Sequence, residues 1–128
     1  MDKLISALLI VAGIIHLLPV SGLLGAERLA TLYGLSFSEP NLLLLMRHRA
    51  VLFGLLGALL VWAAFRPALQ PVAMLGGLVS VLSFLLLAWI TPGYNAALRK
   101  VVIADWVALA CLALAIVLWL LRRPASAG

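Results

Sequence analysis

Four long apolar stretches, separated by short runs that contain proline, glycine or charged residues, dominate the pattern along the chain. A helix needs about 20 mostly apolar residues to cross the hydrocarbon core of a bilayer, and each stretch is close to that length. Proline lies at several of the boundaries, where it interrupts or opens a helix at least cost. The pattern predicts four membrane-spanning helices, at about residues 4–20, 41–65, 71–90 and 101–121.

The longest connection runs from Leu23 to Pro40, between the first and second predicted helices. Its leucines are interspersed with Glu27, Arg28 and Ser36. Such a mixture is typical of a short amphipathic helix or a re-entrant turn at a membrane interface. We therefore expect an all-α fold: one transmembrane domain over residues 1–128, an antiparallel four-helix bundle with a short amphipathic or re-entrant segment after its first helix.

Composition supports a membrane protein and excludes a water-soluble domain. Apolar residues make up 66% of the chain and charged residues only 10%, whereas soluble domains carry about 25% charged residues. The net charge of +5 comes from single or paired basic residues near helix ends. Because they form no basic stripe with interleaved aromatic residues, we expect membrane lipid and no nucleic acid among the partners.

The same basic residues predict an orientation. In a four-span protein both termini lie on one side of the membrane, together with the connection that contains Arg66. That side carries slightly more positive loop charge than the other, which favours cytoplasmic termini. The loop residues compared are Lys3, Arg66, Arg122 and Arg123 on the terminal side, and Arg28, Arg99 and Lys100 on the opposite side.

Small residues at helical spacing predict how the helices pack. In a bilayer, helices associate through close contact of small side chains, because lipid provides no hydrophobic drive. Ala50, Gly54 and Ala58 lie on one face of the second helix. The equivalent faces, which could also serve a homo-oligomer, are Ala73, Gly77, Ser80 and Ser83 on the third helix and Ala104, Ala108, Cys111 and Ala115 on the fourth.

Polar residues inside the predicted spans gather toward one end of the bundle. They are His16, Arg47, His48, Arg49 and Asp105. Polar groups in a bilayer are costly and usually functional, so these five are the candidate ligand-binding residues. No catalytic residue is assigned and no metal site is predicted.

The spacing also predicts which of the two arginines faces inward. Arg47 is seven residues before Gly54 and should share its face, so we expect an ion pair between Arg47 and Asp105. Arg49 then points away from this face, and we expect it to reach the lipid head groups.

Several functions fit this cluster. The interpretation we favour is a pocket for an anionic or quinone-like amphiphile, because the forked donors of arginine match carboxylate, phosphate or carbonyl oxygens. The alternatives are a structural or accessory subunit whose cluster locks the helices, and a small oligomeric transporter. Others are a haem on His16 and His48, a metal on these histidines with Asp105, and a His–Asp acid–base pair. The sequence has none of the standard catalytic motifs, so an enzyme is not favoured.

Some runs resemble those of short uncharacterised bacterial inner-membrane proteins, with the layout of the DoxX-like four-helix proteins. They are His16 to Pro19, Leu32 to Gly34, Met46 to Ala50, Phe53 to Gly57, and Ala104-Asp105. The resemblance covers nearly the whole chain and implies a bacterial inner-membrane address, but it transfers no catalytic residue. Eicosanoid and glutathione membrane enzymes also carry arginine and histidine in their second helix, yet the following Asn and Glu are missing here.

Overall fold

The computed structural model describes the backbone of residues 2–36 and 38–127, and side chains as far as Arg122. In this part of the chain every regular element is a helix, so the predicted all-α class is confirmed. The elements, with η marking a 3-10 helix, are α1 (Asp2–Leu17), η1 (Leu18–Leu24), α2 (Ala26–Tyr33), α3 (Pro40–Ala63), η2 (Pro67–Leu69), α4 (Gln70–Trp89) and α5 (Ala96–Ala127).

Four helical stretches of the described chain are long and apolar enough to cross a membrane, as predicted. The predicted end of the last helix, at about residue 121, is wrong, because α5 continues through Pro124 to Ala127. A proline so close to the end of a helix removes only one hydrogen bond from its last turns. The four stretches are Asp2–Leu24, Pro40–Ala63, Pro67–Trp89 and Ala96–Arg122.

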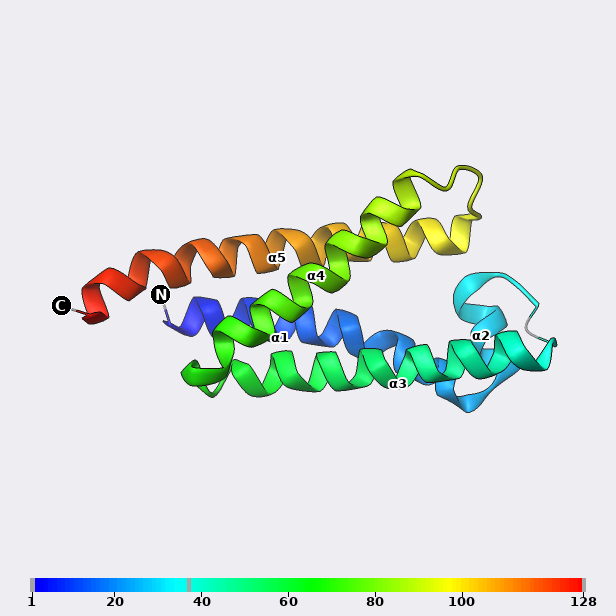
Figure 1. Cartoon of the computed structure of the whole chain (residues 1–128), viewed down its shortest axis with the longest axis horizontal. Coiled ribbons are helices and arrows are strands. Elements are labelled where there is room, and N and C mark those ends of the chain that lie inside the picture. Colours follow the sequence, from blue (N-terminus) through cyan, green and yellow to red (C-terminus); the bar gives the residue numbers. More distant parts are fainter. Residues whose placement is uncertain (1, 37, 128) are drawn as a thin grey trace.

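The two termini lie at the same end of the molecule (Figure 1). The segment with α2 and the turn between α4 and α5 lie at the opposite end, and α4 crosses the other long helices obliquely (Figure 1). α1 packs against both α3 and α5, while α4 packs mainly against α5. This leaves α2 beside η1 and the start of α5, at the end away from the termini.

The predicted helix between the first and second spans is present as α2. Gly25 precedes it with φ 137° and Gly34 ends it with φ 67°, in the region of backbone conformation that favours glycine. Asn95 ties the end of α2 to the start of α5, because its Nδ2 donates to the carbonyl oxygen of Tyr33 at 2.8 Å. The two glycine turns and this bond hold Tyr33 against the bundle.

Glu39 begins α3. Its carboxylate accepts hydrogen bonds from the backbone N–H groups of Asn41 at 3.0 Å and Leu42 at 2.8 Å. Pro40 follows at the first helical position, where its missing N–H costs nothing. The two backbone N–H donors hold the pKa of Glu39 below its usual value. This cap fixes the residue at which α3 begins.

α1 and α3 approach each other closely at Gly13 and Gly57. A Cβ atom on Gly57 would lie 2.9 Å from the carbonyl oxygen of Gly13, so only glycine fits at this crossing. The predicted packing face of α3 is therefore partly wrong: Gly57 is buried with Ala50, whereas Ala58 is exposed. On α4 and α5 the predicted faces hold at Ala73, Gly77, Ala108 and Ala115, which are buried, but not at the exposed Ser83.

Candidate functional site

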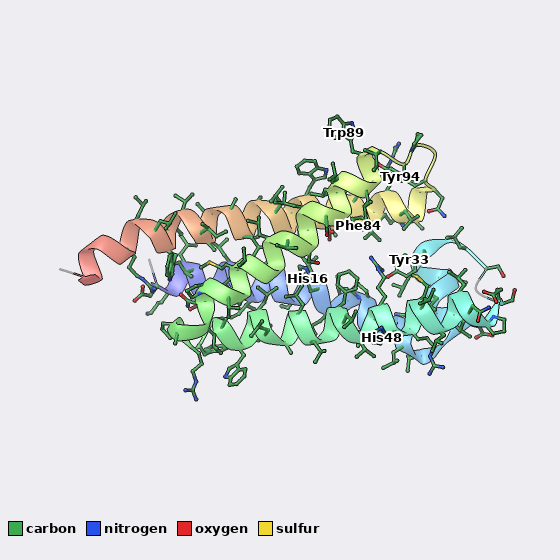
Figure 2. The ribbon with its side chains drawn as sticks, viewed as in Figure 1. His16, Tyr33, His48, Phe84, Trp89 and Tyr94 are labelled. Atoms are coloured by element: carbon green, nitrogen blue, oxygen red, sulfur yellow. The ribbon has the colours of Figure 1, made fainter. Side chains whose placement is uncertain are left out.

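A cavity of about 300 Å³ lies among α1, η1, α2, α3 and α5. We call it the Arg49 cavity. Figure 2 shows two residues of this region, His16 and Tyr33, with Phe84 of α4 nearby. The polar or charged side chains in its wall are His16, Thr31, Tyr33, Arg49, Lys100 and Asp105, and the rest of the lining is Ile15, Leu18, Pro19, Leu32, Phe53, Ala97, Val101 and Ala104.

Arg49 is held by three aromatic rings, which we call the aromatic cage: Tyr33, Phe53 and Phe84. The central guanidinium carbon lies 4.4 Å from the ring centre of Phe53, 5.5 Å from that of Tyr33 and 5.9 Å from that of Phe84. Its Nη1 also donates to the hydroxyl oxygen of Tyr33 at 2.7 Å. Cation–π contacts of this kind stabilise by about 0.5–2 kcal/mol each. Arg49 therefore joins α2, α3 and α4.

His16 is almost fully buried at the end of α1, with 2% of its surface exposed. Its Nδ1 lies 2.8 Å from the carbonyl oxygen of Ala12. Because a carbonyl only accepts, Nδ1 must carry the proton, and the neutral ring then presents Nε2 as an acceptor. The ring centre of Phe53 is 5.8 Å from that of His16, so Phe53 lies close to both the imidazole and the guanidinium of Arg49.

Asp105 lies on α5 and is buried, with 9% of its surface exposed. Its carboxylate makes no hydrogen bond and no ion pair within residues 2–36 and 38–122. The positive charge that acts on it is that of Arg49, which also lines the cavity. The cavity thus combines a caged cation, a buried carboxylate and the acceptor nitrogen of a buried imidazole.

The other two predicted site residues line a different hollow. Arg47 and His48 are exposed and border a groove of about 400 Å³ on the outside of α3, which we call the outer groove. The Nε of Arg47 donates to the carbonyl oxygen of Leu23 at 3.0 Å. The rest of the groove is formed by Leu23, Pro40, Leu43, Leu44 and Val51.

The predicted roles of the two arginines are therefore reversed. The ion pair of Arg47 with Asp105 is wrong, and so is the expectation that Arg49 reaches the head groups. Successive residues of an α-helix are about 100° apart, so Arg47 and Arg49 point in nearly opposite directions. The buried face of α3 runs through Ala50 and Gly57 rather than through Ala50 and Ala58, and this rotation turns Arg49 inward.

The aromatic cage was not predicted from the sequence. The contact between Arg49 and Phe53 could have been predicted, because Phe53 follows Arg49 by four residues and such pairs meet on a helix surface. Tyr33 and Phe84 lie far from Arg49 in the sequence, and nothing in their local patterns indicates this contact. Lys100, which also lines the cavity, belongs to a pair of basic residues that we assigned to a loop.

The two histidines proposed as ligands for a haem or a metal do not line the same cavity. His16 lines the Arg49 cavity, whereas His48 lines the outer groove. Among the described residues no group of three or more His, Cys, Asp or Glu side chains is placed to hold a metal ion.

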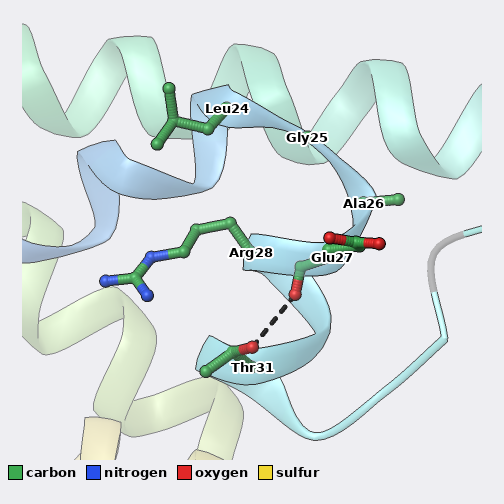
Figure 3. Close-up of a pocket in the computed structure, with 6 residues that line it drawn as sticks. All are labelled: Leu24, Gly25, Ala26, Glu27, Arg28 and Thr31. Carbon is green, nitrogen blue, oxygen red and sulfur yellow. Dashed lines mark hydrogen bonds between the residues drawn. The ribbon is translucent and has the colours of Figure 1, made fainter.

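A further hollow of about 490 Å³ lies in the bend between η1 and α2 (Figure 3). Its lining comes from residues 24–31 alone, and the hydroxyl of Thr31 donates to the carbonyl oxygen of Glu27 at 3.1 Å. Glu27, Arg28 and Thr31 are all exposed, and no buried polar group faces this hollow within that segment. It is a shallow surface hollow within one segment, and it is a weaker candidate for a ligand site than the Arg49 cavity.

Comparison of the chain with protein-family models, with curated proteins and with solved structures finds no match. The resemblance to DoxX-like proteins stays a prediction from the residues quoted above.

Proposed function

We propose that this chain is a multi-pass protein of the bacterial inner membrane, and that it binds the head group of a quinone-like amphiphile in the Arg49 cavity. In this proposal the four long helices cross the bilayer as an antiparallel bundle with cytoplasmic termini. The observation that carries it is the set of charged and polar side chains in one cavity of an apolar bundle. Such groups are costly in a membrane and are usually kept for a ligand or a substrate.

The polar groups of the cavity match a ring that carries carbonyl or hydroxyl oxygens. Arg49 gives one N–H to Tyr33 and has further N–H donors for a carbonyl oxygen. The Nε2 of His16 and the carboxylate of Asp105 can accept from a ligand hydroxyl. Phe53 offers a ring face beside both. A volume of about 300 Å³ lies at the small end of the range for ligand pockets, which suits one substituted ring.

The same wall argues against an anionic head group. An anion near Arg49 would also lie near the carboxylate of Asp105, and like charges repel strongly where water is excluded. A neutral carbonyl or hydroxyl ring has no such cost. We therefore prefer the quinone-like ligand to the anionic amphiphile.

An apolar hollow gives a place for the tail. A pocket of about 180 Å³ lies between the end of α4 and the start of α5. Phe84 lines this pocket and also belongs to the aromatic cage. A ligand whose head group lies in the Arg49 cavity could pass its apolar tail across Phe84. The remaining lining is Leu87, Ala88, Thr91, Tyr94, Leu98 and Val102.

A structural role is the second candidate, because Arg49 contacts side chains of three helices. Under that interpretation Arg49 only holds the three helices together, and the cavity beside it has no ligand. The two candidates differ at Asp105, which makes no bond that would stabilise the bundle. A lock does not need Asp105, whereas a head-group site does.

The test is native mass spectrometry of the full chain, purified in mild detergent from the membrane that produced it. An absorption spectrum of the same sample is recorded before and after borohydride reduction. We expect a stoichiometric amphiphile whose spectrum changes on reduction, as a quinone's does. Arg49→Lys keeps the charge but loses the forked donors, and Asp105→Asn removes the carboxylate charge. Each should weaken the affinity about tenfold, the effect of losing about 1.4 kcal/mol of binding energy, and the occupancy of the purified protein should fall with it.

Arg47→Lys is the matched control, because it makes the same change two residues away and outside the cavity. It should keep full occupancy. A wild-type protein without a redox-active amphiphile would overturn the proposal, as would equal loss in Arg47→Lys and Arg49→Lys. A bound lipid whose absorption spectrum does not change on borohydride reduction would show that the cavity binds an amphiphile other than a quinone.

A further inference from the structure

The outer groove is a second polar site on α3, separate from the Arg49 cavity. The Nε of Arg47 is used by the carbonyl oxygen of Leu23, at 3.0 Å. That bond anchors the guanidinium against η1 and leaves the four N–H donors on its two terminal nitrogens. No other hydrogen bond or ion pair of Arg47 occurs among the described residues. His48, the next residue, borders the same groove and is also exposed.

The groove is positively charged and has no acid in its lining. The nearest acid in the sequence, Glu39, is occupied by the backbone N–H groups of Asn41 and Leu42 at the start of α3. The other groove residues are apolar, with Leu44 and Val51 exposed beside the two polar side chains. A compact cationic spot with apolar neighbours is complementary to an anion that carries hydrocarbon chains.

Arg47 lies toward the end of α3 that is nearer to one membrane face in the proposed bundle, within side-chain reach of lipid phosphates. Arg47 follows Pro40, the first residue of α3, by seven positions, which is about 10 Å along the helix axis. In a spanning helix of this length the backbone at that depth lies inside the hydrocarbon core. Because helical side chains tilt toward the N-terminus, the long side chain of Arg47 can extend its guanidinium toward the nearer head groups. An arginine there needs acceptors for its remaining donors, and phosphate oxygens are the acceptors that a bilayer supplies.

We propose that the outer groove binds the phosphate of an anionic glycerophospholipid. The two terminal nitrogens of Arg47 donate to the phosphate oxygens as a fork, His48 contacts the head group beside it, and one acyl chain runs along Leu44 and Val51. The proposal rests on the proposed membrane insertion. It is independent of any ligand in the Arg49 cavity.

The experiment uses the full chain in nanodiscs of phosphatidylcholine with a minor fraction of phosphatidylglycerol, released into native mass spectrometry. Wild-type protein should retain phosphatidylglycerol in preference to phosphatidylcholine. Arg47→Gln should weaken retention of the first phosphatidylglycerol about tenfold, since it removes charge-assisted hydrogen bonds. Arg47→Lys keeps a point charge without the fork and should fall between the two.

Arg66→Gln is the matched control. Arg66 is also exposed, but it lies between α3 and η2 at the other end of the molecule. It should retain the lipid like wild type, and millimolar inorganic phosphate should not displace the lipid. Equal retention by wild type and Arg47→Gln would overturn the proposal. Displacement by inorganic phosphate, or a dimer lost in Arg47→Gln without any lipid adduct, would assign the groove to a free anion or to a second copy.

The failure of this proposal can be told apart from that of the cavity ligand. Arg47→Gln should keep the cavity amphiphile while it loses phosphatidylglycerol, and Asp105→Asn should do the reverse. A chain that does not enter nanodiscs at all would overturn membrane insertion, and the lipid site with it. A single cooperative thermal transition in Arg47→Gln, as in Arg66→Gln, excludes misfolding as the cause of lost lipid.

Discussion

Arg47 and Arg49 lie two residues apart on α3 and have opposite surroundings. Arg49 lies against three aromatic rings beside the cavity that contains His16 and Asp105. Arg47 lies on the outside, anchored by one backbone carbonyl, and its terminal nitrogens make no bond to any residue that the structure describes. Depth in the helix is nearly equal for the two. The difference therefore comes from the angle around the helix axis, which decides whether the side chain meets the aromatic cage or lies on the outside of the bundle.

The largest expected effect comes from changing the angle at which α3 meets α1. Gly57→Leu places a side chain where even a Cβ would lie 2.9 Å from the carbonyl oxygen of Gly13. We expect a loss of about 3 kcal/mol or more in unfolding free energy, because backbone must move to relieve the overlap. Ala58→Leu, one residue along and exposed, should cost less than about 0.5 kcal/mol.

Unfolding in mixed detergent micelles, followed by circular dichroism, measures both variants. If they lose equal stability, the buried face of α3 has a different angle and the assignment of the two arginines is wrong.

A smaller effect is expected from the arginines themselves. Arg49→Gln removes the hydrogen bond to Tyr33 and the cation–π contacts, and it leaves Asp105 without its nearby positive charge. We expect a loss of about 2–3 kcal/mol in unfolding free energy. Arg47→Gln should cost less than about 1 kcal/mol, since it removes one exposed hydrogen bond. Equal losses in the same unfolding assay would contradict the aromatic cage.

The smallest effect concerns the start of α3, which is closer to the outer groove than to the cavity. The carboxylate of Glu39 caps the helix, and the pKa of this group is depressed in the folded state. Its contribution is therefore present above the unfolded pKa and is lost as the pH falls through the folded value. Glu39→Gln should remove this acid-side dependence of the melting temperature.

Glu27→Gln is the control for that titration, because Glu27 is exposed and caps no N–H group among the described residues. Melting curves recorded between neutral pH and about pH 3 compare both variants with wild type, a range that covers the ordinary pKa of glutamate. An unchanged acid-side slope in Glu39→Gln would show that the cap does not stabilise the fold.

Much of the fold follows from the chain itself. The four apolar runs predict four long helices, and the segment with Glu27 and Arg28 predicts the short helix α2 between two of them. The spacing of apolar residues is a local property, so it predicts a helix without knowledge of the neighbouring helices. Helix ends were less well predicted, as the continuation of α5 beyond Pro124 illustrates, since one proline near a terminus costs little.

The candidate site was predicted only in part. His16, Arg49 and Asp105 were among the five candidates and line one cavity. Arg47 and His48 were placed with them because all five lie at a similar depth. Depth follows from position along a helix. Whether a side chain points into the bundle or out of it does not follow from that position alone, because it depends on which face of the helix is buried.

The residue order fixes the angles between side chains on one helix, about 100° per position, and thereby ensures that Arg47 and Arg49 diverge. It also places the polar residues at the ends of the apolar runs that meet at one end of the helix bundle. Which arginine turns inward depended on the neighbours: α1 meets α3 at Gly13 and Gly57, and that contact rotates Arg49 toward the rings of Tyr33 and Phe84. Close packing of two backbones is a property of a pair of helices, so neither helix encodes it alone.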